Sequence, residues 1–197
     1  MTETKSLFKS QEKKHDSKIL YPFNSYTSLF YLIIIFPLMK QNIEVFDILG
    51  ISIVISLTFS SLLWWGYKNK YVQIIDIISY SLLIFYIGFY YLNKYKNVLD
   101  IFIYLIFVIV YISIKKIELI RFFNISGVLF SLIVVCHYIK NIGEGFGLIL
   151  LILSILNKFT DSFDIIDYNK LNIGSGTGWF HIFSAFGIYL IINNLDK

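Results

Sequence analysis

Charged residues are scarce in this 197-residue sequence, where Asp, Glu, Lys and Arg make up 15% and hydrophobic residues 57%. An ordinary soluble domain carries about a quarter charged residues, so this composition excludes that class. Proline is nearly absent, with two residues, and the single cysteine, Cys136, excludes an internal disulfide. We therefore expect an all-α, polytopic membrane protein.

Long apolar runs divide the chain into seven candidate membrane helices, because about 20 mostly apolar residues are needed to cross the hydrocarbon core. The predicted spans are 25–39, 45–65, 71–92, 98–114, 119–138, 143–157 and 178–193. Residues 1–19 form a polar, basic tail, and residues 20–197 form one seven-helix membrane domain. The first apolar run is too long and too late for a cleavable signal peptide, so we expect it to remain as an anchor.

The lysines and the arginine predict the orientation, because short loops rich in these residues stay in the cytoplasm. Twelve of them fall on the side of the N-terminal tail and five on the other side. An odd number of spans then gives a cytoplasmic N-terminus and an external C-terminus. The net charge of +4 requires no nucleic acid, and a basic inner face suits anionic lipid.

Five polar side chains from five predicted helices share one membrane leaflet. Ser61 and Asp76 lie at equal distances from the loop between their helices, about 10 Å below it at 1.5 Å per residue. Asn24, Asn124 and His181 each enter from the same side, near the start of a span. Ionisable residues at this depth are costly, usually face the bundle interior and often mark function.

Structural roles are the alternative for several of these residues. Asn24 and Asn124 lie near helix ends, where a capping or interhelical hydrogen bond is common. His181 could be an interfacial histidine beside Trp179. Asp76 differs, because no lysine or arginine lies within one turn of it in the sequence. A functional role is therefore the favoured interpretation for Asp76.

Other polar motifs fit a structural interpretation better. The "GSGTG" run at 174–178 lacks the lysine and the preceding strand of a phosphate-binding loop, so we interpret it as a flexible start to the last helix. His137 falls at the far end of its span, a membrane thickness from Asp76. The "DSFDIID" run at 161–167 is interpreted as a solvated loop, with metal ligation by its aspartates as the alternative.

The serine, the aspartate fifteen residues later and the last-helix histidine in "WFHIFSA" resemble the alkaline ceramidases. These enzymes belong to a superfamily of seven-helix membrane hydrolases that includes the progestin and adipoQ receptors and the Per1-type proteins. The "PFNSYTSLFYL" stretch is similar to the first helix of the bacterial ceramidase-like members, with Asn24 at the matching asparagine. The resemblance spans most of the chain and rests on few residues.

The resemblance implies a zinc ion held by three histidines, with the serine and the aspartate completing the site. Ser61, Asp76 and His181 match the family pattern, whereas Trp65 and Thr177 occupy the other two histidine positions. Catalytic zinc needs about three protein ligands and an open position for water. His181 alone falls short, so zinc is doubtful as a cofactor and we expect the purified protein to carry no stoichiometric zinc.

Two functions are carried forward, and a transporter is a distant third. The first is hydrolysis of a ceramide-like lipid amide, with Asp76 and Ser61 handling protons and the oxyanion. The second is lipid binding without turnover, as a receptor, sensor or accessory subunit. The expected catalytic residues are Ser61, Asp76 and His181, with His181 as the remaining metal ligand. The expected cavity or substrate residues are Asn24, Trp65, Asn124, Thr177 and Trp179.

Overall fold

The computed structural model describes residues 12, 18–40, 42–95, 98–115, 119–162, 165–168, 170–171 and 173–195, so most of the predicted tail lies outside the described residues. Within these ranges all regular structure is helical and no strand occurs, which confirms the all-α prediction. The elements are α1 (Pro22–Thr27), the 3-10 helix η1 (Ser28–Ile34), α2 (Ile35–Leu38), α3 (Val45–Tyr67), α4 (Lys70–Tyr95), α5 (Leu99–Lys115), α6 (Ile120–Tyr138), α7 (Ile142–Ser162) and α8 (Gly176–Leu195).

The observed helices follow the predicted spans, and the largest difference is that α7 continues to Ser162 instead of ending at 157. Four helical stretches are long and apolar enough to cross a membrane, namely Val45–Tyr67, Tyr71–Asn93, Ile142–Asp161 and Gly176–Leu195. The apolar helices Pro22–Leu38, Leu99–Ile112 and Asn124–Tyr138 are shorter. These lengths and compositions indicate a membrane protein, although only four of the seven predicted spans meet the length criterion.

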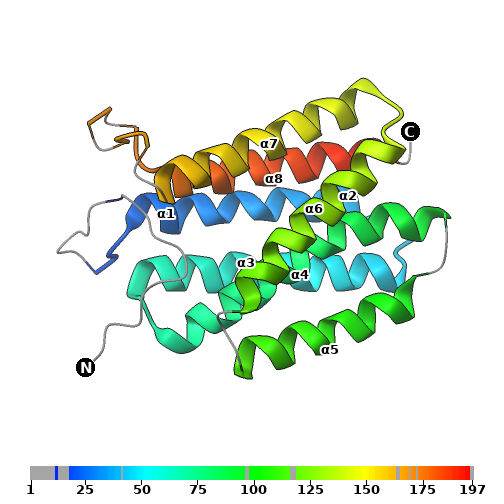
Figure 1. Cartoon of the computed structure of the whole chain (residues 1–197), viewed down its shortest axis with the longest axis horizontal. Helices are drawn as coiled ribbons and strands as arrows, with labels where there is room; N and C mark the ends of the chain where they lie inside the picture. Colours follow the sequence, from blue (N-terminus) through cyan, green and yellow to red (C-terminus); the bar gives the residue numbers. More distant parts are fainter. Residues whose placement is uncertain are drawn as a thin grey trace.

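The helices run roughly along one common axis, with α7 and α8 side by side and α6 crossing the bundle obliquely (Figure 1). α5 lies at the edge of the bundle (Figure 1). One end of the bundle contains the start of α1, the turn between α3 and α4, and the start of α8 (Figure 1). We call it the tail end, and it is where the polar residues of the predicted leaflet gather.

The first helical rod, made of α1, η1 and α2, packs against α3 and α8 and changes from α to 3-10 winding in its middle. Side chains three residues apart eclipse one another in a 3-10 helix. Ser28, Tyr31 and Ile34 follow this spacing, and all three are buried. The winding therefore lines up Ser28 and Tyr31 along the edge that faces the interior.

Glu12 joins the predicted tail to the bundle. Its carboxylate accepts hydrogen bonds from the backbone N–H groups of Phe23, at 2.8 Å, and Asn24, at 2.9 Å. A negative charge is favourable at a helix N-terminus because the first N–H groups have no partner within the helix. Glu12 therefore caps α1 and is itself buried.

α7 and α8 approach each other most closely at two glycines. A Cβ on Gly147 would lie 2.7 Å from the carbonyl oxygen of Gly187, and a Cβ on Gly187 would lie 2.8 Å from that of Gly147. Small residues of this kind let helix backbones touch, as is common in membrane bundles. This contact fixes the position of α8, which carries Thr177 and His181.

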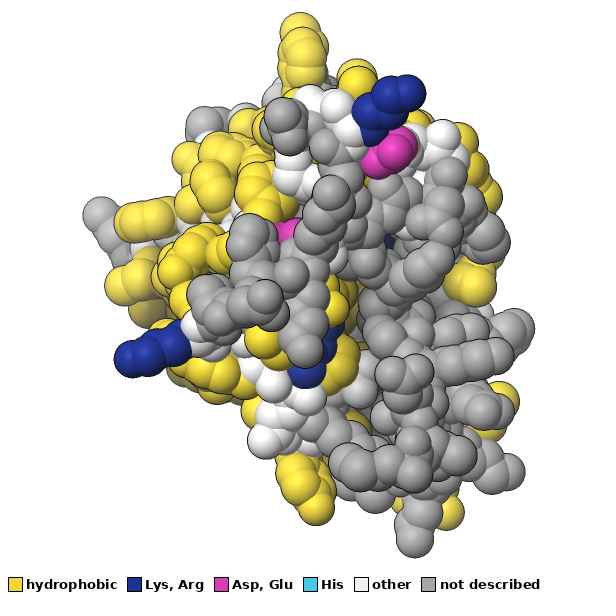
Figure 2. Space-filling model, turned by 90° about the vertical axis from the view of Figure 1, so that its left-hand side faces the viewer, with side chains coloured by type: hydrophobic (Ala, Val, Ile, Leu, Met, Phe, Trp, Pro, Cys, Tyr) yellow, Lys and Arg dark blue, Asp and Glu magenta, His cyan; other side chains and the backbone are white. Residues whose placement is uncertain are grey.

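Large apolar side chains are exposed on the flanks of the bundle. Phe36 is 73% exposed, Tyr104 is 72% exposed and Ile142 is 81% exposed. Viewed from the tail end, hydrophobic side chains project around the flanks, and few described side chains there carry a charge (Figure 2). Soluble monomers rarely expose large apolar surfaces, so these flanks suit a lipid environment.

Candidate functional site

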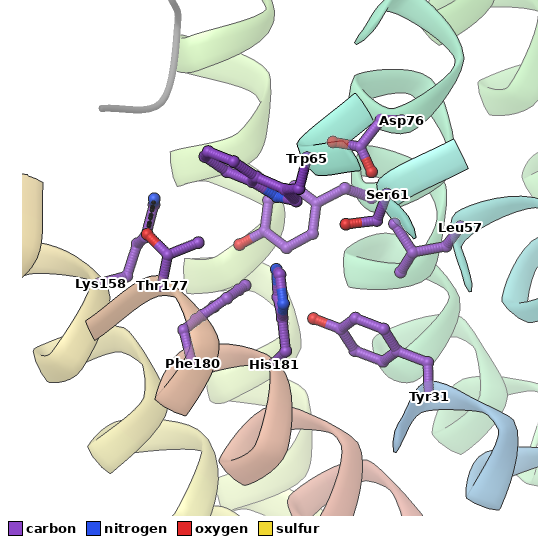
Figure 3. A pocket seen from close by; sticks show the side chains of 10 residues that line it. Tyr31, Leu57, Ser61, Trp65, Asp76, Lys158, Thr177, Phe180 and His181 are labelled. Atoms are coloured by element: carbon purple, nitrogen blue, oxygen red, sulfur yellow. Dashed lines mark hydrogen bonds between the residues drawn. The ribbon is translucent and has the colours of Figure 1, made fainter. Parts of the chain in front are cut away.

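A small cavity lined by polar and aromatic side chains, which we call the polar chamber, lies between η1, α3, α4, α7 and α8 and has a volume of about 40 Å³. Ser61, Trp65, Asp76, Thr177 and His181 all line it, so the structure brings together five of the sequence-predicted residues (Figure 3). The remaining lining residues are Tyr31, Leu57, Tyr80, Lys158 and Phe180.

His181 is held in place through one of its two ring nitrogens. Nδ1 lies 3.2 Å from the Thr27 hydroxyl and 3.4 Å from the Ser28 hydroxyl, and the backbone of Asn24 is a further hydrogen-bond partner of the ring. Tyr31 packs beside the imidazole, with the ring centroids 5.8 Å apart. These contacts on Nδ1 leave Nε2 as the ring atom that can interact with a ligand in the polar chamber.

Ser61 and Asp76 form the opposite wall of the polar chamber (Figure 3). The Ser28 hydroxyl donates a hydrogen bond to Ser61 Oγ over 2.9 Å, which leaves the Ser61 proton free to point elsewhere. Ser61 is the side-chain hydrogen-bond partner of the Asp76 carboxylate. The other carboxylate oxygen, Oδ1, is buried and makes no hydrogen bond with any described residue. Asp76 therefore offers an unused acceptor to a ligand.

Lys158 supplies a positive charge that the sequence interpretation assigned to a loop. Its ammonium group donates a hydrogen bond to Thr177 Oγ1 over 2.7 Å (Figure 3). Thr177 in turn donates to the Asp161 carboxylate through both its hydroxyl and its backbone N–H. Asp161 is fully buried in α7, so the solvated-loop interpretation of the 161–167 run is wrong at this residue.

Of the other two aspartates in that run, Asp167 is exposed, and Asp164 is outside the described residues. The alternative interpretation, metal ligation by these aspartates, is not supported by any group of three ligating side chains among the described residues.

The residues of the polar chamber do not fit a catalytic zinc ion. Among the described residues, no three His, Cys, Asp or Glu side chains lie close enough together to hold a metal. Trp65 and Thr177 carry no imidazole or carboxylate that could ligate zinc, and Thr177 is already bonded to the Lys158 ammonium. A fixed positive charge lies close to the chamber's imidazole, so a divalent cation would meet repulsion as well as too few ligands.

Three predicted cavity residues lie outside the lining of the polar chamber. Asn24 accepts a hydrogen bond from Ser175, just before α8, which ties the "GSGTG" run to α1. Asn124 accepts a hydrogen bond from Ser81 over 2.6 Å and so links α6 to α4. Trp179 donates to the backbone of Ile173 on the outer side. The interpretation of both asparagines as hydrogen-bonding residues between helices therefore fits the structure.

His137, by contrast, lies at the end of α6 away from the tail end and is exposed, as its place in the sequence predicts.

A second cavity of about 50 Å³, which we call the apolar chamber, adjoins the polar chamber. Tyr31, Tyr80 and Phe180 line both cavities. The other walls of the apolar chamber come from α4, α6, α7 and α8 and are mostly aliphatic: Leu83, Ile84, Ile87, Val128, Ser131, Leu132, Leu151, Ser154, Ile155, Ser184 and Ile188. No signal in the sequence marks this chamber, because its residues look like any apolar helix surface.

Comparison of the chain with protein-family models, with curated proteins and with solved structures gave no match.

Proposed function

We propose that the protein is a seven-span integral membrane protein that binds one lipid amide, with the amide in the polar chamber and the adjoining part of the hydrocarbon chain in the apolar chamber. The observation that carries this proposal is the shared wall of the two chambers, formed by Tyr31, Tyr80 and Phe180. A pocket that contains polar side chains beside an aliphatic one suits the two parts of such a lipid. The N-terminus is cytoplasmic and the C-terminus external, as the distribution of lysines favours.

The hydrogen-bonding groups of the polar chamber complement an amide. An amide offers one N–H donor and one carbonyl acceptor. Asp76 Oδ1 is a buried acceptor in need of a donor, and it can receive the amide N–H. The Lys158 ammonium can donate to the carbonyl oxygen from the opposite wall.

The lipid reaches the apolar chamber from the side, between α6 and α7. Both helices contribute to the chamber wall, through Val128 and Leu132 on α6 and Leu151 and Ile155 on α7. The two helices contact each other at few positions, in contrast to the tightly packed α7 and α8. A hydrocarbon chain can therefore pass between them where their packing is sparse.

Hydrolysis without a metal is the second candidate function, and the unpartnered oxygen of Asp76 favours it. Asp76 would accept a proton from a water whose oxygen adds to the amide carbonyl carbon. Asp76 would then return this proton to the amide nitrogen as the C–N bond breaks, which yields a fatty acid and an amine. Ser61 would donate to the developing oxyanion.

One experiment separates binding from turnover. The purified full-length chain is incubated with an N-acyl sphingoid lipid in a maltoside detergent, and native mass spectrometry counts intact bound lipid while chromatography measures released fatty acid. We expect about one intact lipid per chain. Fatty-acid release that disappears in Asp76→Asn would establish the hydrolase alternative. If the chain neither binds the intact lipid nor releases fatty acid, both candidate functions are wrong.

A pair of adjacent substitutions on α6 provides the matched control. Val128→Trp fills the apolar chamber, whereas Leu129 is 55% exposed and Leu129→Trp adds the same bulk on the outer surface. Lipid should be lost only in the first variant. Equal retention in both would place the lipid outside this chamber. Elemental analysis of the same samples is expected to find no stoichiometric zinc.

A further inference from the structure

Three aromatic rings surround the ammonium group of Lys68 at the tail end of α3. Its Nζ lies 4.5 Å from the centroid of Tyr21, 4.2 Å from that of Trp64 and 3.5 Å from that of Trp65. A cation within about 6 Å of a ring face is attracted by the ring quadrupole. We call Tyr21, Trp64 and Trp65 the aromatic cage.

The rings of the cage are inclined to one another rather than stacked. Trp65 stands at 77° to Tyr21 and at 54° to Trp64, with ring centroids 5.9 Å and 6.2 Å away, respectively. Inclined rings around one point form a concave surface, whereas stacked rings would close on themselves. The arrangement therefore forms a concave aromatic surface around the Lys68 ammonium.

Lys68 is a poor occupant of this space. A lysine ammonium has three N–H donors, and Nζ of Lys68 has no hydrogen-bond acceptor among the described residues. Burial, together with repulsion by Lys158, lowers the pKa of Lys68 to about 7. Its backbone also adopts the left-handed conformation, with φ of 54°, which favours glycine or asparagine. These costs indicate that the side chain at this position has a functional role.

We propose that the aromatic cage is a binding site for a quaternary ammonium group, the trimethylammonium of choline or of a choline headgroup, and that Lys68 is a tethered occupant which the ligand displaces. A quaternary ammonium has no N–H donors, so it needs no acceptors inside the cage. It is more weakly hydrated than a primary ammonium and keeps its charge at every pH. Aromatic cages recognise such ligands through the same attraction.

The cage site differs from the proposed lipid-amide site, although Trp65 belongs to the walls of both. It is built from the three rings, and Lys158, whose Nζ lies 5.8 Å from the Trp65 ring centroid, is a neighbouring positive charge. Failure of lipid-amide binding would leave it intact, and its own failure would leave the chambers unaffected.

Tryptophan fluorescence tests the proposal directly. The full-length chain carries three tryptophans, so Trp179→Phe leaves only Trp64 and Trp65 as reporters. In this background Lys68→Gly empties the cage and suits the left-handed backbone. Titration with tetramethylammonium chloride in maltoside micelles should give a saturable change in tryptophan fluorescence. The affinity for tetramethylammonium should be at least about tenfold tighter than when Lys68 is present. Lys68→Asn, which also tolerates this backbone, is the second variant should the glycine variant fold poorly.

Two reference compounds and one cage variant serve as controls for the binding of tetramethylammonium. Sodium chloride controls for ionic strength, and tert-butanol is a neutral molecule of similar shape. An equal response to either, or an unchanged response when Trp64→Leu is added to Lys68→Gly, would overturn the proposal.

A second set of ligands identifies the source of the trimethylammonium group. Free choline is compared with micellar lipids that carry phosphocholine or phosphoethanolamine headgroups. Binding of free choline would indicate a soluble ligand, and stronger binding of the phosphocholine lipid would indicate a headgroup. Binding of the phosphoethanolamine lipid as strongly as the phosphocholine lipid would overturn recognition of a quaternary ammonium.

Discussion

Lys158 gives the polar chamber its positive charge. Its ammonium group is fixed by Thr177 and is attracted first by the Asp161 carboxylate and then by Asp76 across the chamber. Removing one partner of a buried charge pair leaves the other charge uncompensated, which costs far more than a surface pair is worth. The stability of the chamber should therefore depend on both charges together.

We expect Lys158→Met to lower the free energy of unfolding by on the order of 3 kcal/mol. Adding Asp76→Asn should recover part of the loss, so that the two changes are coupled by about 1 kcal/mol or more. Thermal unfolding in detergent measures both effects, and Lys170→Met, at an exposed lysine, is the control. Strict additivity of the two substitutions would show that the charges act independently.

The pKa of Lys68 predicts a pH dependence of stability. Burial and Lys158 lower this pKa to about 7, whereas the unfolded lysine keeps its ordinary value of 10.5, and Asp76 and Glu12 oppose the shift. Between these values the unfolded chain binds more protons than the folded one, so stability rises with pH. The unfolding temperature of the wild type should therefore rise from pH 6.5 to pH 9 relative to that of Lys68→Met. If the unfolding temperatures of the wild type and of Lys68→Met change in parallel with pH, the pKa of Lys68 is not shifted.

Some residues of the site could be predicted from the sequence, and others could not. Ser61 and Asp76 follow from the geometry of a helical hairpin, which fixes their common depth. Lys158 could not be found in this way, because a lysine near the end of an apolar run looks like a residue of the membrane interface. Its burial depends on Thr177 and Asp161, and their approach is set by packing between α7 and α8.

At the scale of single elements, apolar runs predict where helices occur but less well where they end. α7 passes the predicted end at 157 because Asp161 is bonded to Thr177 inside the bundle and does not need water. The 3-10 winding of η1 was also not predicted. Its sequence, "SLFYLII", reads as an ordinary apolar helix, and the tighter winding accompanies packing against α3 and α8.

The glycine contact between α7 and α8 yields a prediction with a control on the same helix. A Cβ at Gly147 would press on the backbone of α8, so Gly147→Ala should separate the helices and cost about 1–3 kcal/mol of stability. Gly145 has open space where a Cβ would be, and Gly145→Ala should be neutral or stabilising by up to about 1 kcal/mol. Thermal unfolding of the two variants compares them directly. Equal changes in their stability would show that the close approach of the two helices does not contribute to stability.

At the scale of the whole molecule, the proposed orientation places the tail end, with both the polar chamber and the aromatic cage, on the cytoplasmic side. Single cysteines test this in a Cys136→Ser background. Asn69 is exposed at the tail end and Asn42 is exposed at the opposite end. An impermeant maleimide added to intact cells should label Asn42→Cys and spare Asn69→Cys until the membrane is permeabilised. Labelling of position 69 alone would reverse the orientation.

The winding of the first rod has a consequence for its reach across a bilayer. A 3-10 helix advances about 2.0 Å per residue, against about 1.5 Å in an α-helix. The seven residues of η1 therefore cover about 14 Å, and the whole rod from Pro22 to Leu38 covers about 29 Å. The hydrocarbon core of a bilayer is about 30 Å thick. The same winding that lines up Ser28 and Tyr31 thus stretches a rod that would be too short as a regular α-helix to nearly the full depth of the hydrocarbon.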